Sequence, residues 1–143
     1  MPRKASPAAA AGYSGTPLAR KLGIGPGARV FVAQGPKDYA TLLAPLPAGV
    51  RLTGRCDATT DVAHLFVTRR AALATTLARW RKALRPDAAV WVSWPKQSSG
   101  VATEVGEGTI RDVALPLGFV DVKVCAVDAT WSALKLVVRT ALR

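Results

Sequence analysis

The chain has 143 residues, of which 50% are hydrophobic, so it is long enough for one compact domain and too apolar to be a disordered chain. Its 20 Lys and Arg residues outnumber nine Asp and Glu residues, and the net charge of +11 favours anionic partners. No apolar run approaches the roughly 20 residues that span a bilayer, and the N-terminus lacks the apolar run of a secretory signal, so we expect a cytoplasmic protein that makes no membrane contact.

The first 53 residues predict a tail followed by four short elements. Residues 1–12 carry Pro, Ala, Ser and two basic side chains without apolar periodicity, which predicts a disordered basic tail before a single domain over 13–143. We then expect a helix that begins at Pro17 and ends at Gly23, a buried strand over 29–33, a helix over 39–43 and a short strand over 50–53.

The middle of the chain predicts a strand, a long helix and a second strand. A turn-rich connector over 54–61 leads into a buried strand over 62–68. The clearest helix follows, because one apolar stripe recurs at helical spacing until Pro86 ends it: Leu73, Leu77, Trp80 and Leu84. A strand over 88–94 comes next, then a polar loop over 96–108.

The last segment predicts a helix and a terminal hairpin. An apolar stripe from Ile110 to Leu117 indicates the helix, which Gly118 can cap. Two strands over 119–127 and 132–138 are joined closely enough to pair antiparallel. The alternating order predicts an α/β fold, a small Rossmann-like three-layer sandwich with a mostly parallel sheet that ends in an antiparallel β-hairpin.

Two resemblances support this fold. The segment DVAHLFVTRRAALATTLARWRKALRPDAAVWVSWPK resembles the fourth strand, helix and fifth strand of class I methyltransferases, in a trimmed version because two connections are unusually short. The blocks YSGTPLARKLGI, WPKQSSGVATEV and GFVDVKVCAVDATWSALKLVVR resemble a family of short bacterial proteins known as domain-of-unknown-function family number 3052. That resemblance implies a fold and a bacterial source, and it implies no catalytic residues.

The candidate site lies where the parallel strands end. Ligands of open α/β sheets bind beyond the carboxyl ends of the strands, and the four loops expected there hold five cationic side chains and no carboxylate: Lys37, Arg55, Arg69, Arg70 and Lys96. We expect a non-catalytic or cryptic domain that binds an anionic, phosphate-bearing ligand at this edge. The candidate ligand-binding residues are Gly35, Lys37, Arg69, Arg70, Trp94, Lys96, Ser98 and Ser99. The alternative interpretation of these cations is a solvated surface.

Three other functions stay open. One is a divergent S-adenosylmethionine-dependent methyltransferase, which would need a glycine-rich turn after the first strand and an acid at the end of the second strand. At the end of its second strand this chain has Gly54 and Arg55 instead of an acid. Nucleic acid could bind without sequence preference to the basic surface, with Tyr13 available for stacking. An exposed edge strand could instead make the domain a protein-interaction module, and the oligomeric state is open.

The remaining reactive side chains point to no catalytic site. The sequence contains no recognisable catalytic constellation, and it predicts neither a cofactor nor a metal site, because one His and two Cys residues are too few for a zinc site. We interpret His64 as a packed, hydrogen-bonded core residue and the two cysteines, Cys56 and Cys125, as buried free thiols.

Overall fold

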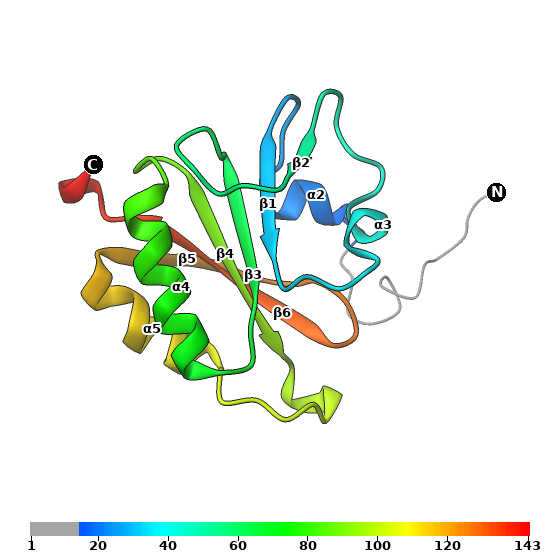
Figure 1. Ribbon diagram of the computed structural model, residues 1–143. Coiled ribbons are helices and arrows are strands. Elements are labelled where there is room, and N and C mark those ends of the chain that lie inside the picture. The colour runs from blue at the N-terminus through cyan, green and yellow to red at the C-terminus, as the bar shows by residue number, and fades with distance from the viewer. Residues whose placement is uncertain (1–14) are drawn as a thin grey trace.

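The computed structural model describes residues 15–143, and the predicted tail over 1–12 lies outside the described residues. Six strands form one sheet in the order β2-β1-β3-β4-β6-β5, with helices on both faces (Figure 1). Strands β1 to β4 are parallel, whereas β6 is antiparallel to both of its neighbours, β4 and β5. The predicted fold class, a mostly parallel α/β sandwich closed by an antiparallel hairpin, is confirmed.

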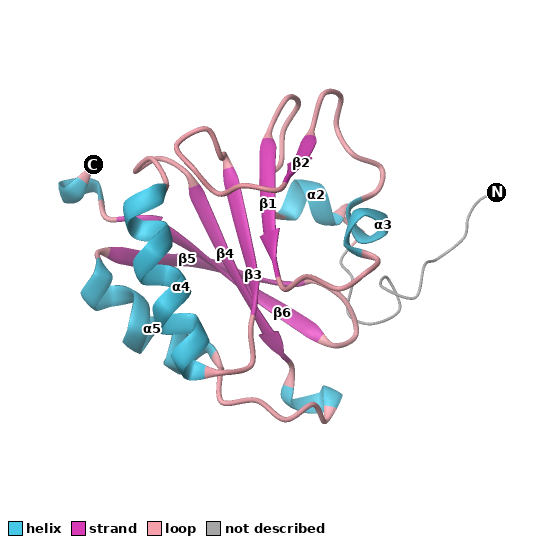
Figure 2. Ribbon diagram, in the orientation of Figure 1, coloured by secondary structure: helices cyan, strands magenta, loops and turns pink. Residues whose placement is uncertain are grey.

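The elements follow the predicted order closely (Figure 2). The strands are β1 (Arg29–Ala33), β2 (Arg51–Thr53), β3 (Val62–Phe66), β4 (Ala89–Pro95), β5 (Phe119–Ala126) and β6 (Trp131–Val138). The α-helices are α2 (Leu18–Lys21), α3 (Tyr39–Leu43), α4 (Arg70–Ala83) and α5 (Glu107–Ala114). Short 3-10 helices add η1 (Gln97–Ser99), η2 (Leu115–Leu117) and η3 (Thr140–Leu142).

Each face of the sheet has its own hydrophobic core. Helices α4 and α5 cover one face, where Leu73 and Leu77 of the predicted α4 stripe are fully buried against β3 and β4. Helices α2 and α3 cover the other face, where Trp91 is fully buried and its indole N–H donates to the Leu22 carbonyl at 2.9 Å. Because strand side chains alternate between faces, neighbouring residues of one buried strand serve both cores.

The order of the strands reverses between β1 and β3. From β1 the chain passes through α3 on one face to β2, and from β3 it passes through α4 on the opposite face to β4. The two helices therefore leave the carboxyl ends of adjacent strands in opposite directions, and this is the point where open α/β sheets bind ligands. The edge between the carboxyl ends of β1 and β3 is termed the crevice. Within residues 15–143, no helix has the length and apolar character needed to cross a bilayer.

Candidate functional site

The crevice begins where the pairing of β1 and β3 ends, at Ala33 opposite Leu65. The chain turns sharply after β1, and Gln34 adopts a left-handed backbone conformation with φ of 59°. A Cβ atom on Gly35 would lie 2.6 Å from Cγ2 of Val32, closer than packed atoms tolerate. Glycine is therefore required at position 35 to let this turn fold against the end of its own strand.

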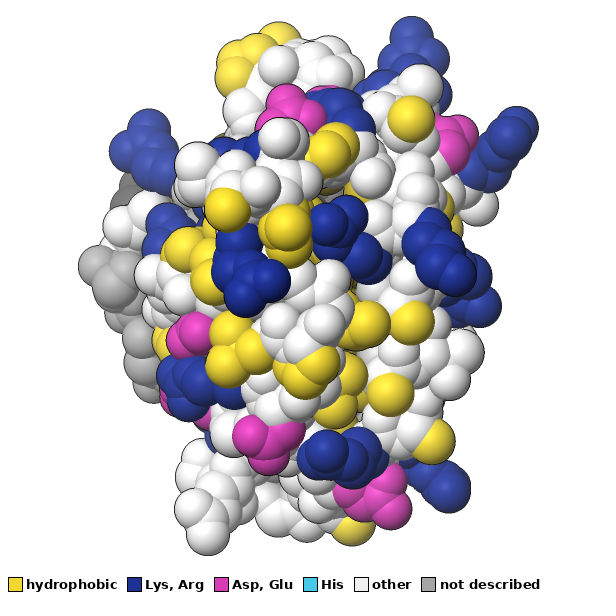
Figure 3. All heavy atoms as spheres, turned by 90° about the vertical axis from the view of Figure 1, so that its left-hand side faces the viewer, with side chains coloured by type: hydrophobic (Ala, Val, Ile, Leu, Met, Phe, Trp, Pro, Cys, Tyr) yellow, Lys and Arg dark blue, Asp and Glu magenta, His cyan; other side chains and the backbone are white. Residues whose placement is uncertain are grey.

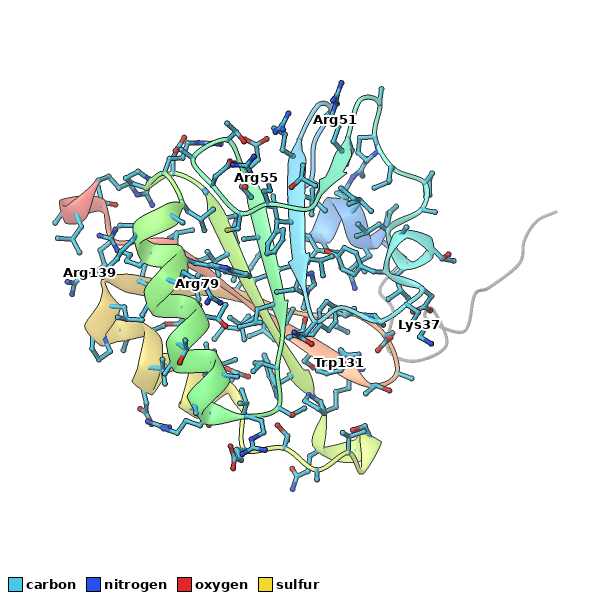
Figure 4. The ribbon with its side chains drawn as sticks, viewed as in Figure 1. Lys37, Arg51, Arg55, Arg79, Trp131 and Arg139 are labelled. Atoms are coloured by element: carbon cyan, nitrogen blue, oxygen red, sulfur yellow. The ribbon has the colours of Figure 1, made fainter. Side chains whose placement is uncertain are left out.

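Three of the predicted cations follow the carboxyl ends of β1 and β3, in the segments that lead into α3 and α4. Lys37 lies on the α3 side, beyond the end of β1, and its side chain is exposed (Figure 4). Arg69 and Arg70 begin α4 on the opposite side and are also exposed. Within residues 15–143, none of these three side chains takes part in an ion pair.

One carboxylate does reach this edge, contrary to the expectation of an acid-free site. Glu104 Oε1 accepts a hydrogen bond from the backbone N–H of Arg70 at 2.9 Å, and the Glu104 N–H donates to the Thr68 carbonyl at 2.8 Å. Glu104 comes from the polar loop before α5, which folds back against the start of α4. Its carboxylate occupies a position at the positive end of the α4 dipole, where an anion is stabilised.

The loop after β4 contributes less than the sequence indicated. The Ser99 hydroxyl donates to the Lys96 carbonyl at 2.6 Å and accepts from the Val101 N–H at 3.2 Å, so it stabilises its own turn. Ser98 is exposed on η1, and Lys96 begins this turn, where its N–H donates to the Thr130 carbonyl at 2.7 Å.

An aromatic ring that the sequence did not single out lies at this end of the sheet. Trp94 and Trp91 lie on opposite faces of β4, as expected, and Trp94 packs half-buried against the core under α4 and α5. Trp131 begins β6 opposite Pro95 and packs edge-on against Phe66, with ring centroids 5.0 Å apart. Figure 4 shows Trp131 at the same end of the sheet as Lys37. The β4–β6 register places Trp131 at this edge, and only the tertiary pairing reveals it.

Arg55 does not join the crevice. Thr53, the last residue of β2, pairs with Phe31 in the middle of β1, so β2 stops before the carboxyl edge. The connector that follows turns back toward the start of β3, where the Asp61 N–H donates to the Arg29 carbonyl at 2.9 Å. Figure 4 accordingly shows Arg55 toward the other end of the sheet from Lys37. The prediction that Gly54 and Arg55 lie at the ligand edge is wrong because β2 is too short.

Beneath the crevice lies a buried chain of three polar side chains. The Tyr39 hydroxyl is 2.8 Å from Nδ1 of His64, and the Ser93 hydroxyl is 2.7 Å from Nε2 of the same ring. Burial lowers the pKa of His64 to about 3, so the imidazole is neutral at physiological pH. Its full burial fits the interpretation of a packed, hydrogen-bonded core histidine and excludes contact with a ligand in this conformation.

Both cysteines are free thiols, but they are half-buried rather than buried. Burial raises the pKa of Cys56 to about 11, an effect that the Asp57 carboxylate strengthens and the Arg79 charge opposes. Burial also raises the pKa of Cys125. The described residues contain no group of three His, Cys, Asp or Glu side chains placed to hold a metal ion.

Basic side chains are not confined to the crevice. Figure 3 shows Lys and Arg side chains spread over the side of the molecule that carries α4 and α5, with Asp and Glu side chains beside several of them. The ion pairs between described residues involve three arginines, Arg55, Arg85 and Arg111. The basic side chains on this side of the molecule therefore do not form one continuous patch.

Solved structures identify the fold. The chain has a methyltransferase-like fold. It is similar to a protein of Sulfolobus solfataricus assigned provisionally to the type 11 methyltransferases, with a TM-score of 0.62 and 13% identity over 86% of this chain and 90% of that one. It is also similar to mitomycin 7-O-methyltransferase, with a TM-score of 0.61 and 13% identity over 79% of this chain and 49% of that one.

A third similar structure is that of LepI in complex with SAM, with a TM-score of 0.52 and 11% identity over 85% of this chain and 39% of that one. No family model matches the chain, and the search of curated proteins finds no match. At these identities the comparisons establish the fold, and the function must be argued from the site.

Proposed function

We propose that this domain binds a phosphate-bearing ligand in the crevice between the carboxyl ends of β1 and β3, without catalysing a reaction. The observation that carries the proposal is the position of Lys37 and Arg69 on opposite sides of the crevice, with no ion pair to either within the described residues. A guanidinium can hold phosphate through two parallel hydrogen bonds, and an ammonium adds a point charge.

The position of Glu104 restricts where the anion can lie. Glu104 accepts the Arg70 N–H, so a carboxylate already stands at the amino end of α4 and would repel a phosphate there. The ligand would instead lie toward Lys37 and Gly35, with the Arg69 side chain reaching it from the α4 side. The Trp131 ring at the same edge offers a flat apolar surface for a nucleobase, which favours a nucleotide over inorganic phosphate.

A thermal-shift titration with ADP, ATP and pyrophosphate tests the proposal. We expect a nucleotide to raise the unfolding midpoint in a concentration-dependent manner. Lys37→Gln and Arg69→Gln should each weaken binding about tenfold, since each removes a charge-assisted contact. Arg139→Gln is the matched control, because Arg139 is exposed at the other end of the molecule (Figure 4).

Two results would reject the nucleotide site. In one, none of the three phosphate ligands shifts the midpoint. In the other, Arg139→Gln weakens binding as much as Lys37→Gln, which indicates non-specific attraction to the net charge of +11. In that second case, a steep loss of binding to single-stranded nucleic acid with rising salt would favour sequence-independent nucleic-acid binding instead.

The second candidate is a divergent methyltransferase, and the fold favours it. Mitomycin 7-O-methyltransferase and LepI in complex with SAM share this sheet. The residues present fit SAM poorly, because β2 ends at Thr53 and is followed by Gly54 and Arg55 rather than by an acid. The nearby Asp57 carboxylate accepts a hydrogen bond from the Thr59 N–H at 2.9 Å. Calorimetric titration with SAM separates the candidates: saturable binding supports this second function, and absence of heat rejects it.

We also infer membership of family number 3052 from the three sequence blocks that resemble it. Two of these blocks, 94–105 and 118–139, form η1 with its loop and the β5–β6 hairpin, which meet where Pro95 pairs with Trp131. If the family shares the ligand, other members should bind the same nucleotide in the same assay. A cytoplasmic location is part of this proposal.

A further inference from the structure

A pocket lies on the α4 face of the sheet because one crossover connection lacks a helix. Parallel strands are normally joined by a crossover of a dozen or more residues, usually with a helix that covers the sheet. Here residues 54–61 link β2 to β3 without an α-helix. The part of β1 beside α4 is left without a helix above it, and Phe31 and Ala33 are only partly buried.

The pocket has a volume of about 290 Å³, close to the lower limit of small-molecule sites. Its floor consists of Phe31 and Leu65 from the sheet, and Trp80 of α4 forms one wall. The rings of Phe31 and Trp80 lie edge to face, with centroids 6.0 Å apart and planes at 75°. The apolar surfaces therefore suit a small, flat, apolar group.

Two polar side chains of α4 face this apolar pocket without a protein partner. Thr76 is 9% exposed and lines the pocket, and its hydroxyl makes no side-chain hydrogen bond among the described residues. A buried hydroxyl without a partner is costly, which makes it a place where a ligand atom would be stabilised. Arg79 lines the same pocket one turn later, and no carboxylate within residues 15–143 forms an ion pair with it.

Charges of both signs lie near the mouth of the pocket, because the Asp57 carboxylate also acts on Cys56, but Arg79 is the charged residue that lines the pocket. The Arg79 charge opposes the rise in the pKa of Cys56, so its guanidinium lies near the thiol that closes the pocket from the connector side. The connector contains two acids, Asp57 and Asp61, and Asp61 is paired with Arg85. Asp57 is the one next to Cys56. Its carboxylate accepts from the N–H and the hydroxyl of Thr59 and lies 3.9 Å from Arg55, so it is held within its own loop.

We propose that this pocket binds a small aromatic carboxylate, with its ring packed against Phe31 and Trp80 and its carboxylate on Arg79 and Thr76. A carboxylate suits the single guanidinium because the two oxygens match its parallel donors, and the Thr76 hydroxyl can donate a further bond. The ring would fill the space that the missing crossover helix leaves. This site lies on the α4 face and adjoins the phosphate crevice at Ala33, Gln34 and Leu65, but its polar groups, Thr76 and Arg79, are not those of the crevice.

The test is an NMR titration of the full-length, ¹⁵N-labelled chain with benzoate and trans-cinnamate, each compared with its neutral amide. We expect saturable shifts of the backbone amides around residues 31–34, 56 and 76–80. The amides of the two acids should bind about tenfold more weakly than the acids, because they lack the charge-assisted bond to Arg79. Phosphate-bearing ligands should leave the amides of residues 56 and 76–80 unshifted, because these residues lie away from the crevice.

Variants of α4 distinguish the pocket from general attraction to a basic protein. Arg79→Gln should weaken benzoate binding about tenfold, and Thr76→Val should weaken it by a smaller factor. Lys82→Gln is the matched control, because Lys82 is an exposed cation three residues further along α4 and does not line the pocket. The proposal would be overturned if Lys82→Gln weakened benzoate binding as much as Arg79→Gln. It would also be overturned if benzoate shifted amide signals scattered over other basic surfaces.

The two thiols provide a second, independent readout. Cys56 lines the pocket, whereas Cys125 packs against the core on the opposite face of the sheet. Saturating benzoate should slow the alkylation of Cys56 by iodoacetamide, measured by mass spectrometry, and leave the rate at Cys125 unchanged. If both rates fall together, or neither falls, the ligand does not occupy this pocket.

Discussion

The hydroxyl of Tyr39 lies 2.8 Å from Nδ1 of His64, and this contact joins α3 to the middle of the sheet. Because Ser93 lies 2.7 Å from the other ring nitrogen, a neutral imidazole finds a partner for its donor and its acceptor alike. Tyr39 also fixes the start of the helix that follows the Lys37 turn. The buried contact therefore connects the core to one side of the phosphate crevice.

Tyr39→Phe should lower the free energy of unfolding by about 1–3 kcal/mol, since it leaves a fully buried ring nitrogen without a partner. Urea denaturation measures the loss. The double variant Tyr39→Phe with His64→Phe removes both polar ends and should lose less than the sum of the two single variants. Strictly additive losses would show that the two side chains do not interact.

The stability of the protein should fall as the pH drops below neutrality. Burial lowers the pKa of His64 from 6.5 to about 3, so between these two pH values the imidazole is protonated in the unfolded chain and neutral in the folded chain. The contribution is fully present above pH 6.5 and declines as the pH falls toward the folded-state pKa. Between about pH 7.5 and about pH 5, the free energy of unfolding should decrease by about 2 kcal/mol.

Urea denaturation at these two pH values checks the decrease, and His64 can be isolated because it is the only histidine in the sequence. His64→Gln keeps hydrogen-bonding groups at this position and removes the titration, so its stability should change much less over the same range. An equal decrease in both proteins would assign the effect to carboxyl groups instead.

Gly35→Ala should destabilise the turn after β1. The added Cβ would lie 2.6 Å from Cγ2 of Val32, and relief of that clash requires movement of a packed strand residue. We expect a loss of about 1–3 kcal/mol in the free energy of unfolding, typical of overpacking. Gly54→Ala is the matched control, because a Cβ there meets nothing within 4 Å, and its effect should stay within about 1 kcal/mol. Equal losses in thermal denaturation of the two variants would contradict this account.

Local sequence patterns were sufficient to predict the helices and strands, but they were not sufficient to predict which side chains meet at the site. The stripe that includes Leu73 and Trp80 predicts α4, because apolar periodicity is a property of neighbouring residues. The extent of β2 depends on its pairing with β1, so the sequence alone places Arg55 at the wrong end of the sheet. The return of Glu104 to the start of α4 likewise spans 34 residues and has no local signal.

Local sequence patterns alone also do not predict the pocket under α4, because the pocket depends on how distant segments are placed in the fold. The turn-rich connector over 54–61 was correctly predicted to lack a helix, but the consequence appears only when the crossover is placed above β1. Thr76 then faces an apolar pocket rather than a packed helix. The length of this connector could have indicated the pocket from the sequence, because it is too short to contain a helix that covers β1.

Lys123 and Lys135 lie directly opposite each other on β5 and β6. Burial, and secondarily the charge of Lys123, lower the pKa of Lys135, which shows that the two ammonium groups interact unfavourably. Like charges facing each other on adjacent strands destabilise a sheet, and opposite charges stabilise it. The hairpin therefore carries a repulsion that a single substitution can relieve.

Lys123→Gln should raise the free energy of unfolding by a few tenths of a kcal/mol, and Lys123→Glu should raise it further, to about 0.5–1 kcal/mol above the parent. Lys123 is exposed, so the substitution alters no core packing. Thermal denaturation at low salt should rank the three proteins in the order Lys, Gln, Glu. Salt at about 1 M shortens the Debye length to about 3 Å and should bring the three midpoints together. A ranking that salt leaves unchanged would assign the effect to strand propensity rather than to charge.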